Sequence, residues 1–468
     1  MPQRLVVVSN RVADPRKTAA GGLAVALGDA LAERGGLWFG WSGKVVEPGE
    51  TPADETPVQL TKTGPVTLAT IDLDRADHDT YYLGFSNRVL WPVFHYRLDL
   101  ADFERALFNG YRKVNAMFAR RLAPLLRPDD IVWVHDYHLI PLADELRALG
   151  VHNRIGFFLH IPLPPQQILA AIPAHEWLMR ALFAYDLVGL QSEADLQHFE
   201  RFVLNEANAE ALPEGHFRAF GRIVRAGAFP IGIDVEEFTR LADEDEARDM
   251  YNMMREQYAK RKLLVGVDRL DYSKGLPQRM RTLRTLLENY PEHRNVATLI
   301  QIASPTREDV EAYVRIRREL EHLAGAINGD FGELDWMPVR YMHRTLSRKR
   351  LPGLLRAGKV ALVTPLRDGM NLVAKEFVVA QDAADPGVLV LSRFAGAAEQ
   401  LREALIVNPH DLEGTAQAIS RALAMPVGER RERHAALLQR VRDYDVHRWC
   451  REYLDALVMA HRDTRAAA

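Results

Sequence analysis

The chain has 468 residues, too many for a single hydrophobic core, so we expect two domains. Its 60 Lys and Arg against 63 Asp and Glu give a net charge of −3, so neither nucleic acid nor a membrane surface is an expected partner. The single cysteine, Cys450, excludes an internal disulfide, and no apolar run is long enough for a membrane span or a signal peptide, so we expect a cytoplasmic protein.

The first apolar run, residues 5–8, predicts a buried parallel strand that ends in a polar turn at residues 9–11. Gly21 and Gly22 then precede a predicted helix. Paired glycines at such a place are typical of a flexible turn or of backbone amides that face an anion. No G-x-G-x-x-G follows this strand and no G-x-x-x-x-G-K-[ST] occurs, which weakens a dehydrogenase or P-loop interpretation.

Residues 81–96 contain six aromatic side chains, although aromatic residues make up 8% of the chain. Aromatic rings with a polar edge suit sugars, but most such rings belong to a core. We expect Phe85, Phe94 and Tyr96 to be structural, and Trp41 is a further candidate for a sugar-binding surface.

Three more apolar runs, at residues 131–134, 155–159 and 187–190, end in polar residues and precede predicted helices. This alternation is typical of a doubly wound α/β sheet, in which function gathers at the strand exits. Asp136 and His160 lie at two of these exits, where a lone aspartate or histidine is more often a turn or cap residue.

In the second half, after a predicted domain boundary near residues 230–238, the run 263–267 leads into a turn that carries Arg269 and Lys274. Two cations at the carboxyl end of a strand fit a diphosphate. Arg307 begins a long charged segment and is interpreted as solvated.

A similar unit follows at residues 360–376, where a buried strand, a loop with Asp368 and Gly369, and a helix from Leu372 succeed one another. A helix N-terminus favours an anion, and Glu376, one turn inside the helix, suits the hydroxyls of a ribose. Taken alone, this unit indicates only a strand, a solvated loop and a helix, with Asp368 as a cap. Together the two units indicate a nucleotide diphosphate.

Seven motifs in order resemble the trehalose-6-phosphate synthases, retaining nucleotide-sugar transferases of glycosyltransferase family 20. They are SNR at 9–11, GGL at 21–23, GLWFGWSG at 36–43, WVHDYHL at 133–139, FFLHIPLP at 157–164, DRLDYSKG at 268–275 and PLRDGMNLVAKE at 365–376. The resemblance extends from residue 5 to about residue 450.

The resemblance implies an α/β fold of the GT-B type, with two doubly wound Rossmann-like domains that face each other across a cleft. The expected domains are an acceptor-binding domain at 1–237, a nucleotide-sugar domain at 238–445 and a returning helix at 446–468. The implied reaction transfers glucose from UDP-glucose to glucose 6-phosphate with retention, which gives α,α-trehalose 6-phosphate and UDP.

The resemblance also implies site residues. The catalytic residues are Arg269, Lys274, His160 and Asp368. The donor-binding residues are Gly21, Gly22, Arg269, Lys274, Leu346, Asp368, Gly369, Met370, Asn371, Leu372, Val373, Ala374, Lys375 and Glu376. The acceptor-binding residues are Arg11, Trp41, Tyr82, Trp91, Asp136 and Arg307. No metal and no cofactor beyond the two substrates is implied.

Three alternatives stay open. One is a sister synthase with another phosphorylated acceptor, such as a glucosylglycerol-phosphate synthase. Another is a metal-dependent transferase that uses a D-x-D motif, at residues 72–74 or 243–245, although both stretches are interpreted as exposed. The third is a catalytically silent sugar-phosphate sensor. The sequence also leaves open a homo-oligomer (dimer or tetramer) and the choice among UDP, GDP and ADP donors. It assigns dephosphorylation of the product to a separate phosphatase.

Overall fold

The computed structural model describes residues 3–12, 27–28, 31, 35–307 and 310–466, with side chains described through residue 460. It divides the chain into two compact units, residues 1–230 with 449–468, and residues 231–448. The first boundary, after residue 230, lies seven residues before the predicted one, and the second, before residue 449, lies three residues after the predicted one. The carbonyl of Ile231, the first residue of the second unit, accepts a hydrogen bond from the ammonium of Lys375, 2.7 Å away.

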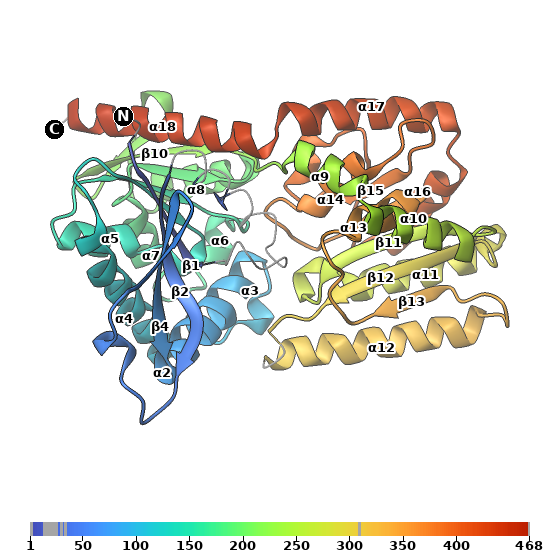
Figure 1. Ribbon diagram of the computed structural model, residues 1–468, viewed down its shortest axis with the longest axis horizontal. Coiled ribbons are helices and arrows are strands. Elements are labelled where there is room, and N and C mark those ends of the chain that lie inside the picture. Colours follow the sequence, from blue (N-terminus) through green and yellow to red (C-terminus); the bar gives the residue numbers. More distant parts are fainter. Residues whose placement is uncertain (1–2, 13–26, 29–30, 32–34, 308–309, 467–468) are drawn as a thin grey trace. The chain divides into compact units, whose positions relative to one another are not determined.

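The first unit contains a ten-stranded sheet in the order β3-β4-β2-β1-β5-β6-β7-β10-β9-β8 (Figure 1). Its strands are β1 (Leu5–Arg11), β2 (Gly36–Val46), β3 (Gln59–Thr63), β4 (Val66–Asp74), β5 (Ile131–His135), β6 (Arg154–Phe158), β7 (Leu187–Leu190), β8 (Glu210–Leu212), β9 (His216–Ala219) and β10 (Arg222–Ala228). The strands from β4 to β10 in this order are parallel, and β3, β8 and β9 pair antiparallel at the edges. The apolar runs of the interior strands β1, β5 and β6, at residues 5–8, 131–134 and 155–158, are buried, as the sequence predicts for parallel strands.

The helices of the first unit connect these strands. They are α2 (Arg75–Asp77), α3 (Trp91–Phe94), α4 (Arg105–Leu122), α5 (Leu142–Ala148), α6 (Gln166–Leu169), α7 (His175–Leu182), α8 (Glu193–Asn205) and α18 (Val446–Ala466). The aromatic-rich segment forms a π-helical stretch, His78–Leu90, that packs against α4. Phe85 and Phe94 are buried there, as predicted for structural residues.

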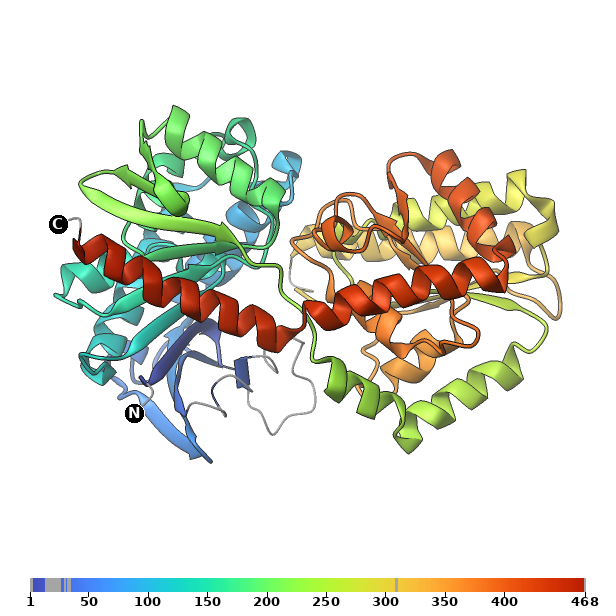
Figure 2. The same ribbon diagram turned by 90° about the horizontal axis from the view of Figure 1, so that it is seen from above.

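Helix α18 lies against the strands of the first unit (Figure 2). The ring of Tyr453 stacks on Trp133 with centroids 4.6 Å apart, and its hydroxyl donates to the carbonyl of Phe157 at 2.9 Å. Glycines on the facing strands make room for this ring, since a Cβ at Gly189 would lie 2.6 Å from it. The sequence of β6 and β7 therefore determines where the C-terminal helix docks.

The second unit contains a six-stranded, all-parallel sheet in the order β13-β12-β11-β14-β15-β16. Its strands are β11 (Lys262–Arg269), β12 (Ala297–Ser304), β13 (Val339–Met342), β14 (Val360–Val363), β15 (Val388–Ser392) and β16 (Leu405–Val407). The order reverses between β11 and β14, which is the switch point at which doubly wound sheets bind ligands.

The helices of this unit form two groups. Helix α11 contacts α12 and α16, while α14 contacts α9, α13 and α17, and α12 runs alongside β13 (Figure 1). They are α9 (Val235–Ala242), α10 (Asp245–Gln257), α11 (Leu276–Asn289), α12 (Glu311–Phe331), α13 (Leu351–Ala357), α14 (Leu372–Ala380), α15 (Ala397–Gln400), α16 (Leu412–Ala424) and α17 (Val427–Asp443). Two α/β units with parallel-rich sheets confirm the predicted fold class. Within the described residues, no helix is both long and apolar enough to cross a membrane.

If Tyr453 docks against glycine, a methyl group at Gly189 must displace a packed ring. We expect Gly189→Ala to destabilise the first unit by about 1–3 kcal/mol. The control is Gly325→Ala on α12, where no atom lies within 4 Å of the added methyl and about 0.5–1 kcal/mol of stabilisation is expected. Urea unfolding followed by tryptophan fluorescence reports both, because Trp133 stacks on Tyr453 in the first unit and Trp336 is buried in the second. Equal midpoints for the two variants would contradict this docking.

Candidate active site

The loops that follow β11 and β14 meet at the switch point of the second sheet. The amide of Leu366 donates to the carbonyl of Ser273 at 2.7 Å. Gly275 adopts a φ of 65°, and a Cβ there would lie 2.6 Å from the carbonyl oxygen of Thr364. Glycine therefore allows the two loops to approach each other closely.

An ion pair joins these two loops. The ammonium of Lys274 lies 2.5 Å from Oδ2 of Asp368, and the amide of Asn371 donates to the same oxygen at 2.9 Å. Arg269 ends β11 nearby in sequence and is exposed. The structure thus brings Lys274, Asp368 and Asn371 together, as the resemblance implied, with the carboxylate balancing the lysine charge.

The turn after β15 supports the loop after β14. The amide of Asp368 donates to the carbonyl of Phe394 at 3.1 Å, and the amide of Gly396 donates back to the carbonyl of Asp368 at 3.2 Å. A side chain at Gly396 would clash with the carbonyl oxygen of Gly369. This glycine is therefore required for the position of the loop, although it belongs to no predicted site.

Helix α14 begins directly after this loop, behind Asn371 at a φ of 80°. Glu376 is only 8% exposed, and its burial raises the pKa of its carboxyl to about 6, although Arg348 opposes the shift. Lys375 points into the interior, where its ammonium donates to the carbonyl of Ile231 and to Gln400, each at 2.7 Å. Its burial lowers the pKa of that ammonium to about 7. Only the backbone of Lys375 is therefore placed for donor binding.

For the remaining predicted donor residues, the structure gives the position in the fold and the burial. Leu346 is half-buried in the irregular segment between β13 and α13. Met370 is buried, whereas Leu372 and Val373 are half-buried in the first turn of α14. Gly21 and Gly22 lie outside the described residues.

A row of cationic and aromatic side chains leads from the end of β1 in the first unit. The guanidinium carbon of Arg11 lies 5.6 Å from the ring of Trp41, and that ring lies 5.6 Å from the ring of Tyr82. Tyr82 stacks in turn on His138 at 5.9 Å. Three predicted acceptor residues are thus neighbours, and His138 joins them.

Asp136 follows β5 in a backbone conformation that is otherwise almost restricted to glycine, with φ 76° and ψ 165°. Its amide donates to the carbonyl of Phe158 at 2.8 Å, and its Oδ1 accepts from the amide of His160 at 3.3 Å. Strain of about 1–3 kcal/mol is typical of residues held for function rather than for stability. The geometry favours a functional Asp136 over a simple turn residue.

His160 lies between two polar side chains. Its Nε2 is 3.0 Å from Nδ1 of His135, and its Nδ1 is 3.4 Å from the amide nitrogen of Gln191. Burial lowers the pKa of His160 to about 3, so the ring is neutral at pH 7. Because both ring nitrogens face protein groups, contact between the ring and a donor sugar stays a prediction.

Trp91 and Arg307 are more enclosed than the sequence indicates. Trp91 is 4% exposed and lies 5.7 Å from the ring of Tyr137. Arg307 donates to the hydroxyl of Tyr313 at 2.7 Å and lies 3.7 Å from Oδ2 of Asp271, with its side chain 7% exposed. The interpretation of Arg307 as solvated, at the start of a helix, is wrong because it precedes α12 and has a buried acidic partner. Its acceptor role stays a prediction, as does that of Trp91.

The first D-x-D motif is also less exposed than predicted. It ends strand β4, and Asp72 accepts a 2.5 Å hydrogen bond from the hydroxyl of Ser42 while only 7% exposed. Such a carboxylate is structural. Within the described residues, no three His, Cys, Asp or Glu side chains are grouped to hold a metal.

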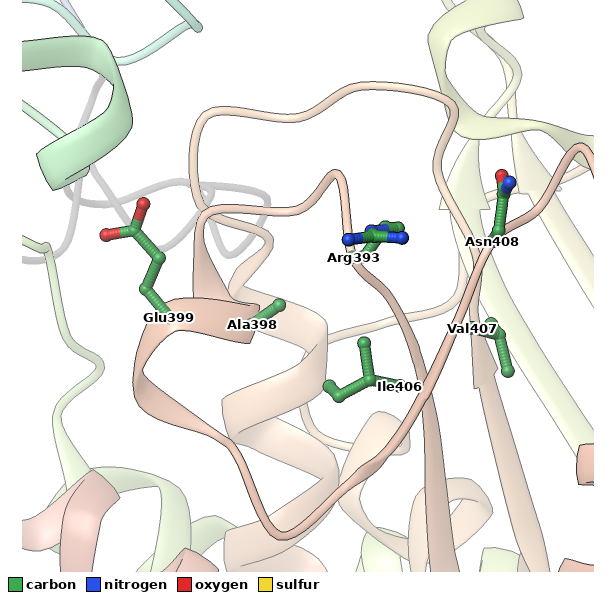
Figure 3. A pocket seen from close by; sticks show the side chains of 6 residues that line it. All are labelled: Arg393, Ala398, Glu399, Ile406, Val407 and Asn408. Carbon is green, nitrogen blue, oxygen red and sulfur yellow. The ribbon is translucent and has the colours of Figure 1, made fainter. Parts of the chain in front are cut away.

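A separate cavity of about 290 Å³ opens near the last two strands of the second sheet (Figure 3). Ile406, Val407 and Asn408 line one part of it, Ala398 and Glu399 line the other side, and Arg393 lies between them. None of the predicted site residues lines this cavity, so it carries no part of the expected chemistry.

The sequence pattern of glycosyltransferase family 20 matches residues 5–459. The chain belongs to this family. It is 50% identical over 458 residues to the trehalose-6-phosphate synthase of Sinorhizobium fredii, a match that covers 97% of this chain and 98% of that protein.

Solved structures agree with this membership. A UDP-forming α,α-trehalose-phosphate synthase from Burkholderia xenovorans, in complex with glucose-6-phosphate, is 52% identical, with a TM-score of 0.92 over 97% of this chain and 99% of that one. A structure from E. coli bound with UDP-2-fluoro glucose is 47% identical, with a TM-score of 0.92 and the same coverage. The predicted family is confirmed.

The sequence missed several residues that shape this family-20 site. The loops after β11 and β14 are supported by the contact of Arg279 with Thr364 and by the close approach of Gly396 to Gly369. In the first unit, His135 contacts His160 and His138 contacts Tyr82. A basic residue within the apolar pattern of α11 was the available signal for Arg279, since buried helix positions are rarely charged. The others had no local signal, because their contacts join distant parts of the chain.

The buried carboxyl of Glu376 is expected to lower the free energy of unfolding at high pH. Its folded pKa of about 6 exceeds the ordinary 4.5, so the folded state binds more protons between these values and its stability falls as pH rises through them. Above pH 6 the cost is about 2 kcal/mol. We expect Glu376→Gln to raise the free energy of unfolding at pH 8 by about 1–2 kcal/mol, with no gain below pH 4.5.

If Glu376 accepts from the ribose hydroxyls of the donor, the same variant should lose most of the stabilisation that UDP gives the wild type, since an amide replaces the carboxylate. Denaturant titrations at pH 8 and pH 4, with and without UDP, measure both effects. Glu256→Gln on the exposed face of α10 is the control and should change neither. A destabilised Glu376→Gln at pH 8 would show that the carboxylate stabilises the fold.

Proposed function

We propose that this chain transfers glucose from UDP-glucose to glucose 6-phosphate with retention, and forms α,α-trehalose 6-phosphate and UDP. The observation that carries the proposal is the cationic switch point of the second sheet, where Lys274 and Arg269 lie at a strand exit and the free amides of α14 begin the adjoining helix. These groups match a leaving diphosphate. Family membership supplies the sugar chemistry.

The donor binds at the two joined loops. Arg269 and Lys274 hold the diphosphate, Glu376 accepts from the ribose hydroxyls, and Leu346 and the amides from Leu372 onward complete the nucleotide pocket. Lys274 exchanges Asp368 for a phosphate oxygen on binding, and Asp368 is released to accept from a hydroxyl of the glucosyl ring. A charge-assisted contact thus replaces another, which limits the desolvation cost.

The acceptor binds at the aromatic row of the first unit. Trp41 is buried, and Tyr82 packs against it with the two rings tilted by 55°, so the half-buried Tyr82 is the ring that offers a face and a polar edge to a sugar. Arg11 ends this row and binds the 6-phosphate, and the family resemblance assigns Arg307 to the acceptor as well. Asp136 and Trp91 complete the acceptor residues carried over from the family.

In the reaction the bond between the anomeric carbon of the donor and the diphosphate oxygen breaks, and the acceptor's anomeric oxygen bonds to that carbon on the same face. The departing diphosphate takes the proton of the attacking hydroxyl. Lys274 and Arg269 stabilise the charge that grows on the diphosphate, so catalysis rests on preorganised electrostatics and positioning.

We further infer that the enzyme works in the cytoplasm, that a separate phosphatase removes the phosphate of the product, and that a homo-oligomer is compatible with this activity. Nothing in the proposed chemistry requires a second subunit.

The proposed reaction is tested by incubating the protein with UDP-, GDP- or ADP-glucose and with glucose 6-phosphate or glycerol 3-phosphate. We expect UDP-glucose with glucose 6-phosphate to be the best pair, and NMR of the product to show an α linkage at both anomeric carbons. Preference for glycerol 3-phosphate would favour the sister synthase. A β linkage would exclude front-face transfer, and no turnover with any pair would favour a sensor.

Loss of the leaving-group cation should remove catalysis but not the fold. We expect Lys274→Ala to lower kcat about a hundred- to thousandfold. Lys359→Ala is the matched control, because Lys359 also pairs with an aspartate (Asp385, 3.3 Å) but lies at the amino end of β14. It should keep wild-type turnover. Comparable rates for Lys274→Ala and the control would remove Lys274 from the mechanism.

Because protein cations supply the positive charge at the diphosphate, we expect turnover to continue in excess chelator. The assay compares initial rates with and without EDTA, and again after magnesium or manganese is added back. Activity that disappears in chelator and returns with the metal would favour the metal-dependent alternative.

A further inference from the structure

A buried arginine lies beneath the two loops of the donor site. Arg279 belongs to α11, directly after the loop that carries Lys274, and is only 2% exposed. A fully buried arginine is rare because removing a guanidinium from water is costly. Its surroundings therefore call for an explanation.

The guanidinium of Arg279 joins three neighbouring strands, two of them at their carboxyl ends and β12 near its middle. It donates to Asp268 on β11 at 2.5 Å, to Gln301 on β12 at 2.8 Å, and through Nε to the hydroxyl of Thr364, just after β14, at 3.0 Å. These strands are adjacent in the order β12-β11-β14. One side chain thus fixes the spacing of the strands on both sides of the switch point.

The backbone leaves space for this network. A Cβ at Gly266, in the middle of β11, would lie 2.5 Å from Nη1 of Arg279 and would also clash with Oε1 of Gln301. Asp268 precedes Arg269, and Thr364 begins the loop that carries Asp368. Two of the three acceptors of Arg279 therefore lie within a few residues of a predicted donor-site residue, and the third, Gln301, lies on β12, the neighbour of β11.

Stability alone gives a weak reason for such a network. Replacing a buried ion pair with apolar side chains of similar volume is often neutral or stabilising, because the desolvation cost of two charges offsets their attraction. The planar fork of arginine, in contrast, imposes directions on several acceptors at once. Arg279 therefore contributes to the relative positions of its acceptors rather than to the stability of the fold.

We propose that Arg279 is a positioning residue for the transfer reaction, acting through Asp268 and Thr364 to hold the diphosphate-binding cations of one loop at a fixed distance from the other loop. The inference rests on the proposed function. If this network is loosened, Arg269 and Lys274 are misplaced. The loss of stabilisation is greatest where the diphosphate carries the most negative charge, which is in the transition state and in bound UDP.

The most conservative test is Thr364→Val, which keeps the side-chain shape and the pair of Arg279 with Asp268. We expect kcat to fall about five- to tenfold and UDP affinity, measured by calorimetry, to weaken by a similar factor, whereas the KM for glucose 6-phosphate stays unchanged. Thr415→Val is the matched control. Thr415 is equally buried, makes one hydrogen bond to the carbonyl of Asn408 at 3.0 Å, and lies on α16.

A purely structural role predicts that Thr364→Val and Thr415→Val have the same melting temperature and the same kinetics, and that result would overturn the inference. Arg279→Lys gives a second test. It keeps the charge beside Asp268 but not the fork, so we expect it to reproduce the Thr364→Val losses or exceed them. Wild-type kcat and UDP affinity in Arg279→Lys would likewise overturn it.

Failure of the proposed function is distinguishable from failure of this inference. A wild-type protein without transfer activity would reject the proposed function, and the UDP affinities would still test the network. An active wild type with Thr364→Val equal to the control would reject only the role of Arg279.

Discussion

The ion pair between Lys274 and Asp368 is the interaction on which the proposed donor site depends. At 2.5 Å it joins the loops that leave two adjacent strands of one sheet, and it keeps a lysine and an aspartate, each less than 15% exposed, in a neutral pair. The pairing offsets the cost of removing both charges from water. The pair therefore preserves a cation that a diphosphate can take over.

The rest of the second unit supports this pair. Gly275 and Gly396 let backbone segments approach where any side chain would clash, and Arg279 fixes the strand ends below. In the first unit, α18 covers the strands behind His135 and His160 through Trp449, whose ring lies 6.2 Å from that of His160. Both units thus place their reactive edges on parallel strands whose own residues are apolar and buried.

Sequence patterns predicted the interior strands well because parallel strands buried on both faces are mainly apolar, as in β7 and β14. They did not predict the antiparallel edge strand β3, whose residues are mostly exposed and carry no apolar alternation. The π-helical segment that carries Tyr82 was likewise missed, since its period is set by packing against α4.

The candidate site was predicted largely through short motifs, and the structure shows what those motifs leave out. Lys274, Asp368 and Asn371 come together as the family resemblance implied. The burial of Arg307 depends on Asp271 and Tyr313, and the inward direction of Lys375 depends on Ile231. Asp271 and Ile231 are distant in sequence from the residues that they contact. No local pattern encodes such contacts.

The exchange of partners by Lys274 is tested most directly by UDP binding to Asp368→Asn, measured by calorimetry beside the wild type. If the carboxylate competes with the diphosphate for Lys274, then the amide should release the lysine, and UDP should bind severalfold more tightly even as transfer from UDP-glucose falls. If UDP binds more weakly to this variant, Asp368 positions the lysine and does not compete for it. That result would contradict the exchange on which the mechanism depends.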